Sequence, residues 1–528
     1  MKRQVLFIII VIIMIAVNTF SQNIEYWSEP ITKKPKGLTE PIILGQYNKN
    51  IYAMQAKYSN AFTDNIKLDV YSADLVLQSM TDLLTKVPTV STLEVFGEKR
   101  KEEFDNVFMI DNRIYMFTTV FNKDENKHKA YARIFNENGE LIKNLTELDE
   151  KQKEKGFWNY GVAKFIYRLS EDKSKILVIH YPSIKDKYSN ERLYFKIYNR
   201  ELELLKSGDI ELPYKDKAMS IEKILITNDG IIDILASVVI DSKSIIKGES
   251  RYFYNISVVN PDDPSNMNTF EIKLEKEYIS DITISLDSMN NILCCGFYGH
   301  ATKSTGINGT FFIKIDGKTY EYVVQNKKPF DEDFLMEFKI ERKVTKGEGL
   351  ASFTIRDLVH REDGGIIMIA EQYFVITYET YNSQTGSWST HYVYHYEDII
   401  IINIRPDGEI DWYTRIPKQQ ISGGGTQFFS YALAVVRDKM YFIYLDNPKN
   451  MAFKSSKNMK SFDNPKSAVV VLATVSNDGS VKKEQLFTSK EVKAYLMPES
   501  HKAINDNELI INSQIRGNWK LFKFAFKE

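Results

Sequence analysis

Short apolar runs separated by polar turn residues recur along almost the whole chain. Examples are IYAMQA at 51–56, KILVIH at 175–180 and ELIINSQI at 508–515, each preceded by Asn, Asp or Lys in a turn-like context. Runs of this length that are rich in Ile, Val, Tyr and Phe, with little helical spacing between them, are typical of β-strands. The pattern therefore predicts an all-β protein.

The same kind of turn precedes the same kind of apolar run eight times, at intervals of about 57 to 75 residues. Asn, Asp and Gly dominate these turns because tight hairpins that suit the twist of β-strands require positive φ angles. Repeats of this size are typical of the blades of a β-propeller. The eight turns are Asn48-Lys49-Asn50, Asp111-Asn112, Asp172-Lys173, Asp229-Gly230, Asn290-Asn291, Asp363-Gly364, Asp438-Lys439 and Asp506-Asn507.

A second turn further along each unit joins the expected third strand to the outermost one, and it occurs only seven times. The eighth unit ends at Glu528 directly after the strand WKLFKFAF, so its outermost strand is missing. We expect residues 23–34 to pair with that open edge, because closure removes the unpaired backbone groups of an open ring. The prediction is one propeller of eight four-stranded blades closed by its N- and C-terminal strands, with seven blades as the alternative.

The sixth unit has two strands that are too long for a blade. They run as GIIMIAEQYFVITYETY and THYVYHYEDIIIINI, and they form a hairpin at about 366–404 that we expect to project by roughly 20 to 25 Å. Tyr and Trp bury a large area at low entropic cost, so an aromatic projecting hairpin is typical of a recognition element. The alternative is a hairpin folded back over its own propeller. The candidate binding residues are Tyr378, Tyr381, Trp388, His391, Tyr394 and His395.

Two of these candidates are histidines that share one strand face with Glu397. Imidazole and carboxylate are zinc and copper ligands, so this face is a candidate metal site by residue type. Residues four apart on a strand are about 13 Å from each other, which is too far for His391 and His395 to bind one ion. We therefore expect no metal here and no bound cofactor elsewhere.

The N-terminus has the features of an export signal. Lys2 and Arg3 precede an apolar run at residues 5–17, and small residues at Thr19 and Ser21 precede Gln22. The run is shorter than the roughly 20 residues of a spanning helix. We expect residues 1–21 to be removed and residues 22–528 to form the propeller, with no transmembrane segment after cleavage and a periplasmic or secreted location.

The net charge and the catalytic motifs bear on which classes of function fit the chain. The formal net charge is −1 and both signs are interspersed, which argues against nucleic acid as a partner. Neither Gly-x-Ser-x-Gly nor His-Glu-x-x-His occurs, although propeller enzymes assemble sites from several blades. Glu371, Lys418, Gln419 and Gln420 are polar positions near a buried blade, and they are interpreted either as channel-lining residues or as satisfied edge groups.

The adjacent Cys294 and Cys295 lie in an expected strand, so their side chains should face opposite ways as two buried thiols. A second interpretation starts from a resemblance. Adjacent cysteines, together with the segment DGEIDW at 407–412, resemble features of quinoprotein alcohol dehydrogenases, whose propellers bind pyrroloquinoline quinone beside a ring formed by two cysteines. The other units lack the Trp of that motif, and no set of calcium ligands is evident.

The segments DGGIIMIAEQYF and YEDIIIINIRPDGEIDWYTRIPKQQ, with Ser-Gln-Asn at 21–23, resemble uncharacterised exported proteins of Bacteroidetes over about a quarter of the chain. This resemblance implies an envelope or secreted location and no known activity. The leading hypothesis is a noncatalytic propeller that binds an envelope protein or a glycan. The alternative is a propeller enzyme, either glycan-active or a quinone-dependent oxidoreductase. The oligomeric state is left open.

Overall fold

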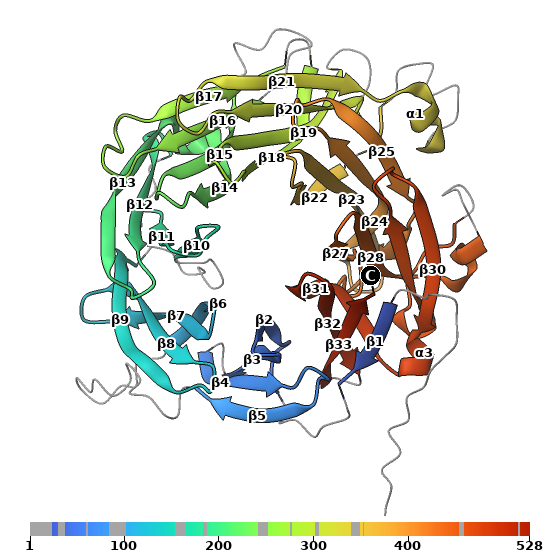
Figure 1. Ribbon diagram of the computed structural model, residues 1–528, viewed down its shortest axis with the longest axis horizontal. Coiled ribbons are helices and arrows are strands. Elements are labelled where there is room, and N and C mark those ends of the chain that lie inside the picture. Colours follow the sequence, from blue (N-terminus) through green and yellow to red (C-terminus); the bar gives the residue numbers. More distant parts are fainter. Residues whose placement is uncertain are drawn as a thin grey trace, which may run out of the picture.

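A computed structural model shows eight antiparallel sheets arranged in a ring (Figure 1). It describes residues 24–29, 37–59, 62–83, 102–153, 165–182, 187–240, 252–274, 277–300, 306–338, 349–351, 353–452, 459–515 and 518–527. Each sheet is one blade of four strands, and blade 6 carries one further short strand. The predicted eight-bladed propeller is thereby confirmed.

Within a blade the strands follow each other from the centre of the ring outwards (Figure 1). Blades 1 to 4 consist of β2 (Ile42–Tyr47), β3 (Asn50–Ser59), β4 (Phe62–Tyr71) and β5 (Leu77–Asp82); β6 (Glu102–Ile110), β7 (Arg113–Asn122), β8 (Lys127–Asn136) and β9 (Leu141–Gln152); β10 (Ile166–Leu169), β11 (Ile176–His180), β12 (Asn190–Tyr198) and β13 (Leu204–Lys215); and β14 (Met219–Ile226), β15 (Ile232–Val239), β16 (Tyr252–Val259) and β17 (Asn268–Ile272).

The second half of the ring holds blades 5 to 8 and two short helices, α1 (Glu332–Phe338) and α3 (Ser489–Val492). Its strands are β18 (Glu277–Leu286), β19 (Ile292–His300), β20 (Gly309–Ile315) and β21 (Tyr322–Pro329); β22 (Phe353–His360), β23 (Ile366–Asn382), β24 (Ser387–Ile404), β25 (Ile410–Ile416) and the short β26 (Gln420–Ser422); β27 (Ala432–Val436), β28 (Lys439–Asp446), β29 (Val469–Val475) and β30 (Val481–Thr488); and β31 (Tyr495–Asn505), β32 (Glu508–Ile515), β33 (Asn518–Phe526) and β1 (Ile24–Ser28).

Blade 8 is built from both ends of the chain, as the missing outermost strand predicts. β1 pairs antiparallel with β33, and Ile24 lies opposite Phe526. The ring of Tyr26 packs against Phe487 at a centroid distance of 4.4 Å, and the backbone N–H of Leu521 donates to Glu29 Oε2 at 3.2 Å. The N-terminal strand thus satisfies the edge of β33 and adds to the core between blades 7 and 8.

The predicted turns between first and second strands are present in all eight blades. Asn48, Asp111 and Asn290 have φ angles of 46°, 54° and 63°, so these turns use the left-handed region that Asn and Asp tolerate. β5 ends at Asp82 and β6 begins at Glu102, and α1 lies in the connection between β21 and β22.

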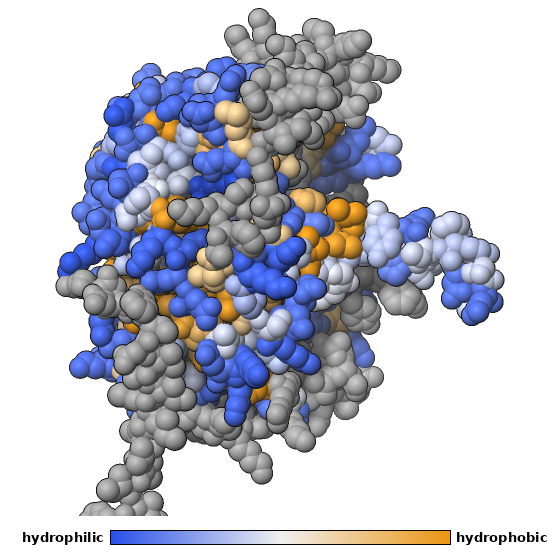
Figure 2. Space-filling view, turned by 90° about the vertical axis from the view of Figure 1, so that its right-hand side faces the viewer, coloured by the Kyte–Doolittle hydropathy of each residue, from blue (hydrophilic) through white to orange (hydrophobic). Residues whose placement is uncertain are grey.

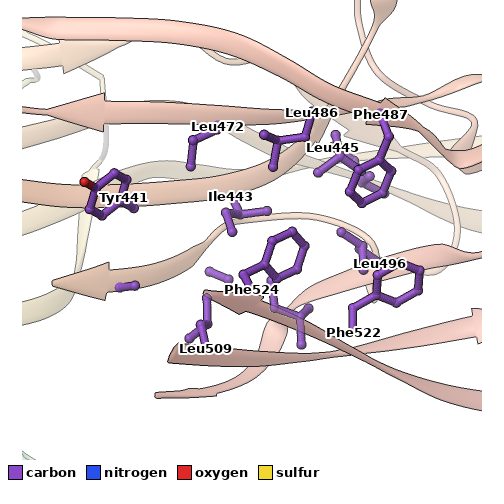
Figure 3. Packing of buried hydrophobic residues seen from close by; sticks show 14 of the residues in the cluster. Tyr441, Ile443, Leu445, Leu472, Leu486, Phe487, Leu496, Leu509, Phe522 and Phe524 are labelled. Atoms are coloured by element: carbon purple, nitrogen blue, oxygen red, sulfur yellow. The ribbon is translucent and has the colours of Figure 1, made fainter. Parts of the chain in front are cut away.

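Apolar clusters fill the spaces between neighbouring blades. Figure 3 shows one of them, where Ile443 and Leu472 of blade 7 face Phe522 and Phe524 of blade 8. Each of these four side chains is at most 1% exposed. Because a blade buries both of its faces against its neighbours, the second and third strands read as nearly continuous apolar runs, and a separate core lies at each interface between neighbouring blades.

The innermost strands carry carboxylates that tie one blade to the next. The hydroxyl of Tyr167 donates to Asp105 Oδ2 at 3.2 Å, and the hydroxyl of Tyr431 donates to Asp357 Oδ2 at 2.7 Å. The backbone N–H of Ile355 donates to Asp281 Oδ2 at 2.6 Å. Asp281 and Asp357 directly follow β-bulges of their strands, and Asp105 lies at such a bulge. These carboxylates are therefore bonded across blade interfaces.

The connections divide between the two ends of the ring. In an antiparallel four-stranded blade, the turns after the first and third strands leave at one end, and the connections after the second and fourth strands leave at the other. We call these ends the turn face and the loop face. The three longest connections, from Asp82 to Glu102, from Pro329 to Phe353 and from Asp446 to Val469, all belong to the loop face. Insertions of repeat proteins that gather on one face commonly mark the binding face.

Candidate binding site: the arm of blade 6

The β23–β24 hairpin continues far beyond its blade. Its ladder runs without interruption from the pair Tyr373–Tyr396 to the pair Asn382–Ser387. β22 pairs with β23 only as far as Gln372, and β26 pairs with β24 only from Tyr396 to Tyr394. We call residues 375–394 the arm. It leaves the ring on the loop face, because it connects the second and third strands of blade 6.

The tip of the arm is a four-residue loop with a glycine in its last position. Gly386 has a φ of 68°, and its backbone N–H donates to the carbonyl oxygen of Asn382 at 2.8 Å. The side-chain oxygen of Asn382 accepts from the backbone N–H of Gln384 at 2.9 Å. Turn chemistry of this kind fixes the register of a hairpin. The register in turn determines which side chains share a face of the arm.

The arm stands out from the ring as a narrow ribbon (Figure 2). Its large side chains are unusually accessible, with exposed fractions of 67% for Trp388, 55% for Tyr381, 51% for Tyr392 and 49% for Tyr378. Val375 and Ile376, where the arm begins, are 38% and 47% exposed. The arm therefore does not lie folded across its own propeller.

One face of the arm carries aromatic–histidine pairs, and we call it the histidine face. Tyr378 stacks on His391 with ring centroids 5.0 Å apart and an interplanar angle of 15°. At the root, Phe374 stacks on His395 at 4.3 Å and 14°. His391 Nε2 lies 2.7 Å from the Thr380 hydroxyl, and His395 Nδ1 lies 2.9 Å from Glu397 Oε1. Each imidazole ring therefore already makes one ring stack and one polar contact within its own hairpin.

The opposite face carries tyrosines and the tryptophan, and we call it the tyrosine face. Tyr381 and Trp388 form a cross-strand pair near the tip, with ring centroids 5.0 Å apart. Tyr392 and Tyr394 follow on β24 towards the ring. Pairs of this kind stabilise a two-stranded ribbon, which is marginal in water without such contacts. All six candidate residues except His395 consequently lie on the arm, and His395 lies at its root.

The two histidines are not brought together at one metal position. Both histidines lie on β24, but His391 contacts Thr380 of β23 and His395 contacts Glu397 of β24, and Val393 lies between them on that face. Among the described residues no group of three or more His, Cys, Asp and Glu side chains has the geometry to hold a metal ion.

A buried ionic cluster holds the root of the arm. Lys418 Nζ lies 2.7 Å from Glu371 Oε1 and donates to Gln420 Oε1 at 3.0 Å. The hydroxyl of Ser430 donates to Glu371 Oε2 at 2.7 Å. Glu371, Lys418 and Gln420 are at most 1% exposed. These three side chains are therefore interior groups with polar partners, and they do not line an open channel. The neighbouring Gln419 accepts a hydrogen bond at its backbone carbonyl from the N–H of Phe462 at 2.8 Å.

Arg356 extends this cluster towards the arm. Its Nη2 atom lies 3.2 Å from Glu371 Oε2, and its guanidinium carbon lies 5.5 Å and 5.6 Å from the ring centroids of Tyr373 and Tyr396. Burial lowers the pKa of Arg356, but the nearby carboxylates of Glu371 and Glu499 outweigh this effect and the pKa is raised overall. A permanent cation beneath two tyrosine rings sets the orientation of the arm where it leaves the ring.

The cysteines occupy opposite sides of β19. Cys294 packs in the cluster between blades 4 and 5, and Cys295 packs in the cluster between blades 5 and 6. Both thiols are free and fully buried, and burial raises the pKa of Cys295 to about 12. Trp412, from the segment that resembles the quinoprotein motif, donates its indole N–H to the carbonyl oxygen of Asn477 in blade 7 at 2.8 Å. The tryptophan therefore docks one blade on the next.

One nucleophile–base contact was not evident from the sequence. The hydroxyl of Ser285 on β18 contacts Nε2 of His360 on β22, across the inner strands of blades 5 and 6. The two residues are 75 positions apart, so no local motif signals the pair. In the described part of the chain no carboxylate bonds to the other ring nitrogen of His360, and the pair lacks the orienting group of a catalytic triad.

Comparisons with known proteins give likeness of shape only. No protein-family model matches the chain, and no curated protein matches it. Among solved structures, the WD40 domain of SCAP from fission yeast is 8% identical, with coverage of 96% of this chain and 98% of that chain and a TM-score of 0.38. A polysaccharide lyase, the PL25 ulvan lyase, is 10% identical over 85% of this chain and 94% of its own, with a TM-score of 0.32.

A protein of unknown function from Bacteroides caccae is also similar, with 10% identity, coverage of 69% of this chain and 94% of that chain, and a TM-score of 0.26. Similarities this low do not transfer a function to the chain.

Proposed function

We propose that the chain is an exported, noncatalytic propeller that captures a protein or glycan partner in the cell envelope with the arm of blade 6. The observation that carries this proposal is the exposure of Trp388, Tyr381, Tyr392 and Tyr378, which are 67%, 55%, 51% and 49% accessible on one free ribbon. Soluble proteins seldom leave so many large side chains in water without a use for them, and tyrosine and tryptophan dominate binding energies at interfaces.

The root of the arm supports the same proposal. A free two-stranded ribbon is marginally stable, yet here a fully buried ion pair, Lys418 with Glu371, and the cation of Arg356 hold its base in one orientation. Rigid presentation lowers the entropic cost of binding. The arm also shares the loop face with the longest connections of the ring. The propeller would thus act as a rigid platform for one protruding recognition element.

Export and location are part of this proposal. The predicted signal at residues 1–21 lies outside the described residues, and its features support periplasmic or secreted placement. No helix in the described ranges is both long and apolar enough to cross a membrane.

Shortening the arm tests the proposal. Ile376 and Val393 form a cross-strand pair, so residues 377–392 can be replaced by an Asn-Gly turn that preserves the ladder below. The shortened protein should keep its melting temperature within a few degrees but lose capture of envelope proteins and of glycans on an array. Met289→Ser, at a residue 66% exposed in the turn between β18 and β19, is the matched control and should bind as the wild type does.

Unchanged binding by the shortened protein would contradict the proposal. The alternative is a propeller enzyme, glycan-active or quinone-dependent. The Ser285–His360 contact is the observation that favours a hydrolytic version. Release of acyl groups from a glycan that persists without the arm and disappears in Ser285→Ala would establish that alternative.

A further inference from the structure

We infer that the arm takes its partner by strand addition, with an extended, charge-poor polypeptide segment pairing along the free edge of β23. This inference rests on the proposed function and names the class of partner. The edge in question begins where β22 ends its pairing, at Gln372, and runs to Asn382. An exposed strand edge presents unpaired backbone N–H and C=O groups, which are a template for another strand.

No described segment of the chain covers this edge. Just before β22 the backbone is drawn towards blade 5, because Leu350 and Ile307 exchange backbone hydrogen bonds of 2.7 and 2.8 Å. The opposite edge, that of β24, is already extended by β26, which pairs with Tyr394 to Tyr396. Strand addition therefore already occurs within blade 6 at the root of the β24 edge. Along the arm itself no described strand pairs with the outer edge of residues 375–382 or of residues 387–393, and of these two edges only that of β23 carries a carboxylate, Glu379.

The edge also carries few of the devices by which proteins protect exposed strands, because its one charged side chain is Glu379. Lysine, proline, β-bulges and inward charges normally prevent edge pairing. Between Val375 and Asn382 the sequence is VITYETYN, with no lysine, arginine or proline, and the register shift of this hairpin lies further back, between Glu371 and Tyr373. β-Branched and aromatic residues fill the segment, and these have the highest β-propensity. An unprotected edge of this composition is suited to being paired.

Side-chain chemistry favours a polypeptide over a glycan. The rings of Tyr378 and Tyr381 already have one side covered, by His391 and Trp388 respectively, which reduces the aromatic surface open to a sugar. A strand on the β23 edge would instead place its alternate side chains beside both faces of the arm. Glu379 is the arm's single carboxylate and has no ion pair among the described residues. We therefore expect an apolar and hydroxyl-rich partner strand with one basic residue opposite Glu379.

Three ten-residue peptides test the inference. The first alternates valine and threonine around one central lysine, the second replaces the two residues before that lysine with proline, and the third replaces the lysine with glutamate. The first peptide should bind the full chain at least tenfold more tightly than the other two in fluorescence anisotropy, because proline removes a ladder hydrogen bond and glutamate faces Glu379. Amide hydrogen exchange should slow at residues 375–382 and remain unchanged at residues 387–394.

Two variants sharpen the result. Glu379→Lys should reverse the preference between the lysine and glutamate peptides, which a nonspecific apolar contact would not do. Ser389→Lys adds the same charge on the facing strand and should leave the preference as it is. Ser389 lies opposite Thr380 in the ladder, so the two substituted positions are at nearly the same distance along the arm from the ring.

Several outcomes would overturn strand addition. These are equal binding of the lysine and proline peptides, protection that maps to β24, arm-dependent binding of glycans but of no peptide, or a dimer whose residues 375–382 are protected without any peptide. If the shortened arm abolishes envelope capture while any of these outcomes holds, strand addition fails and the proposed function stands. If the shortened arm leaves capture unchanged, the proposed function itself fails.

Discussion

At the scale of single residues, buried polar groups in this ring are of two kinds. Most have partners, as Glu371 does with Lys418 and Ser430. Asp233 on β15 is different, because it is 1% exposed and neither of its carboxylate oxygens accepts a hydrogen bond from a described residue. Burial raises the pKa of Asp233 from 3.8 to about 7. A buried, unpaired carboxylate favours its protonated form.

This carboxyl makes stability depend on pH. Because its pKa is higher in the folded than in the unfolded protein, the folded state holds the proton more tightly, and stability falls as pH rises from about 4 to about 7. The loss in the free energy of unfolding is at most roughly 4 kcal/mol. Asp233→Asn should remove this contribution to the pH dependence of the free energy of unfolding. Urea unfolding at pH 5 and pH 8 would measure it, with Asp229→Asn in the neighbouring turn as the control. An unchanged slope in Asp233→Asn would contradict the assignment.

At the scale of elements, the arm combines a predictable part with an unpredictable one. The alternation of the strand places His391 and His395 on one face and Tyr392 and Tyr394 on the other, and the observed register agrees. The sequence also predicts that these two strands are longer than ordinary blade strands, as the structure shows. Alternation alone could not distinguish a free arm from one folded back, because both keep the same ladder and differ only in long-range contacts.

The glycine at the tip should control the order of the arm. Gly386 has a φ of 68°, and a Cβ added to it would have no heavy atom within 4 Å, so alanine there meets no clash and only backbone strain. Gly386→Ala should cost about 1 kcal/mol and increase amide exchange in residues 377–391 roughly fivefold. Gly423→Ala, in the link after β26, is the control and should leave exchange in the arm unaltered. A response to Gly423→Ala equal to that of Gly386→Ala would argue against a tip effect.

At the scale of the whole molecule, closure depends on the first strand after the predicted signal. β1 contributes a ladder of five residue pairs to β33, and Lys523 Nζ lies 4.9 Å from the ring centroid of Trp27. Removing this strand exposes the edge of β33 and part of the core between blades 7 and 8. The ring then has an open edge of the kind that promotes association between chains.

A protein that begins at Gly37 should therefore be less stable by roughly 3 to 6 kcal/mol and should aggregate with rising concentration. Thermal unfolding followed by circular dichroism would measure the loss. A synthetic peptide of residues 23–34 added in trans should restore part of the melting temperature, whereas the same peptide with proline in place of Tyr26 should not. An equal melting temperature with and without β1 would show that the ring does not depend on this closure.

Strands and turns followed from local chemistry, and the blade number and the composite eighth blade followed from counting the repeated turns along the chain. Alternating or continuous apolar runs define strands, and positive φ angles at Asn, Asp and Gly define the turns, so these two kinds of element are encoded within a few neighbouring residues. The cluster of Glu371, Lys418 and Ser430 and the Ser285–His360 contact join residues through packing. Such contacts depend on how neighbouring blades meet around the ring, and no periodicity along the chain records that arrangement.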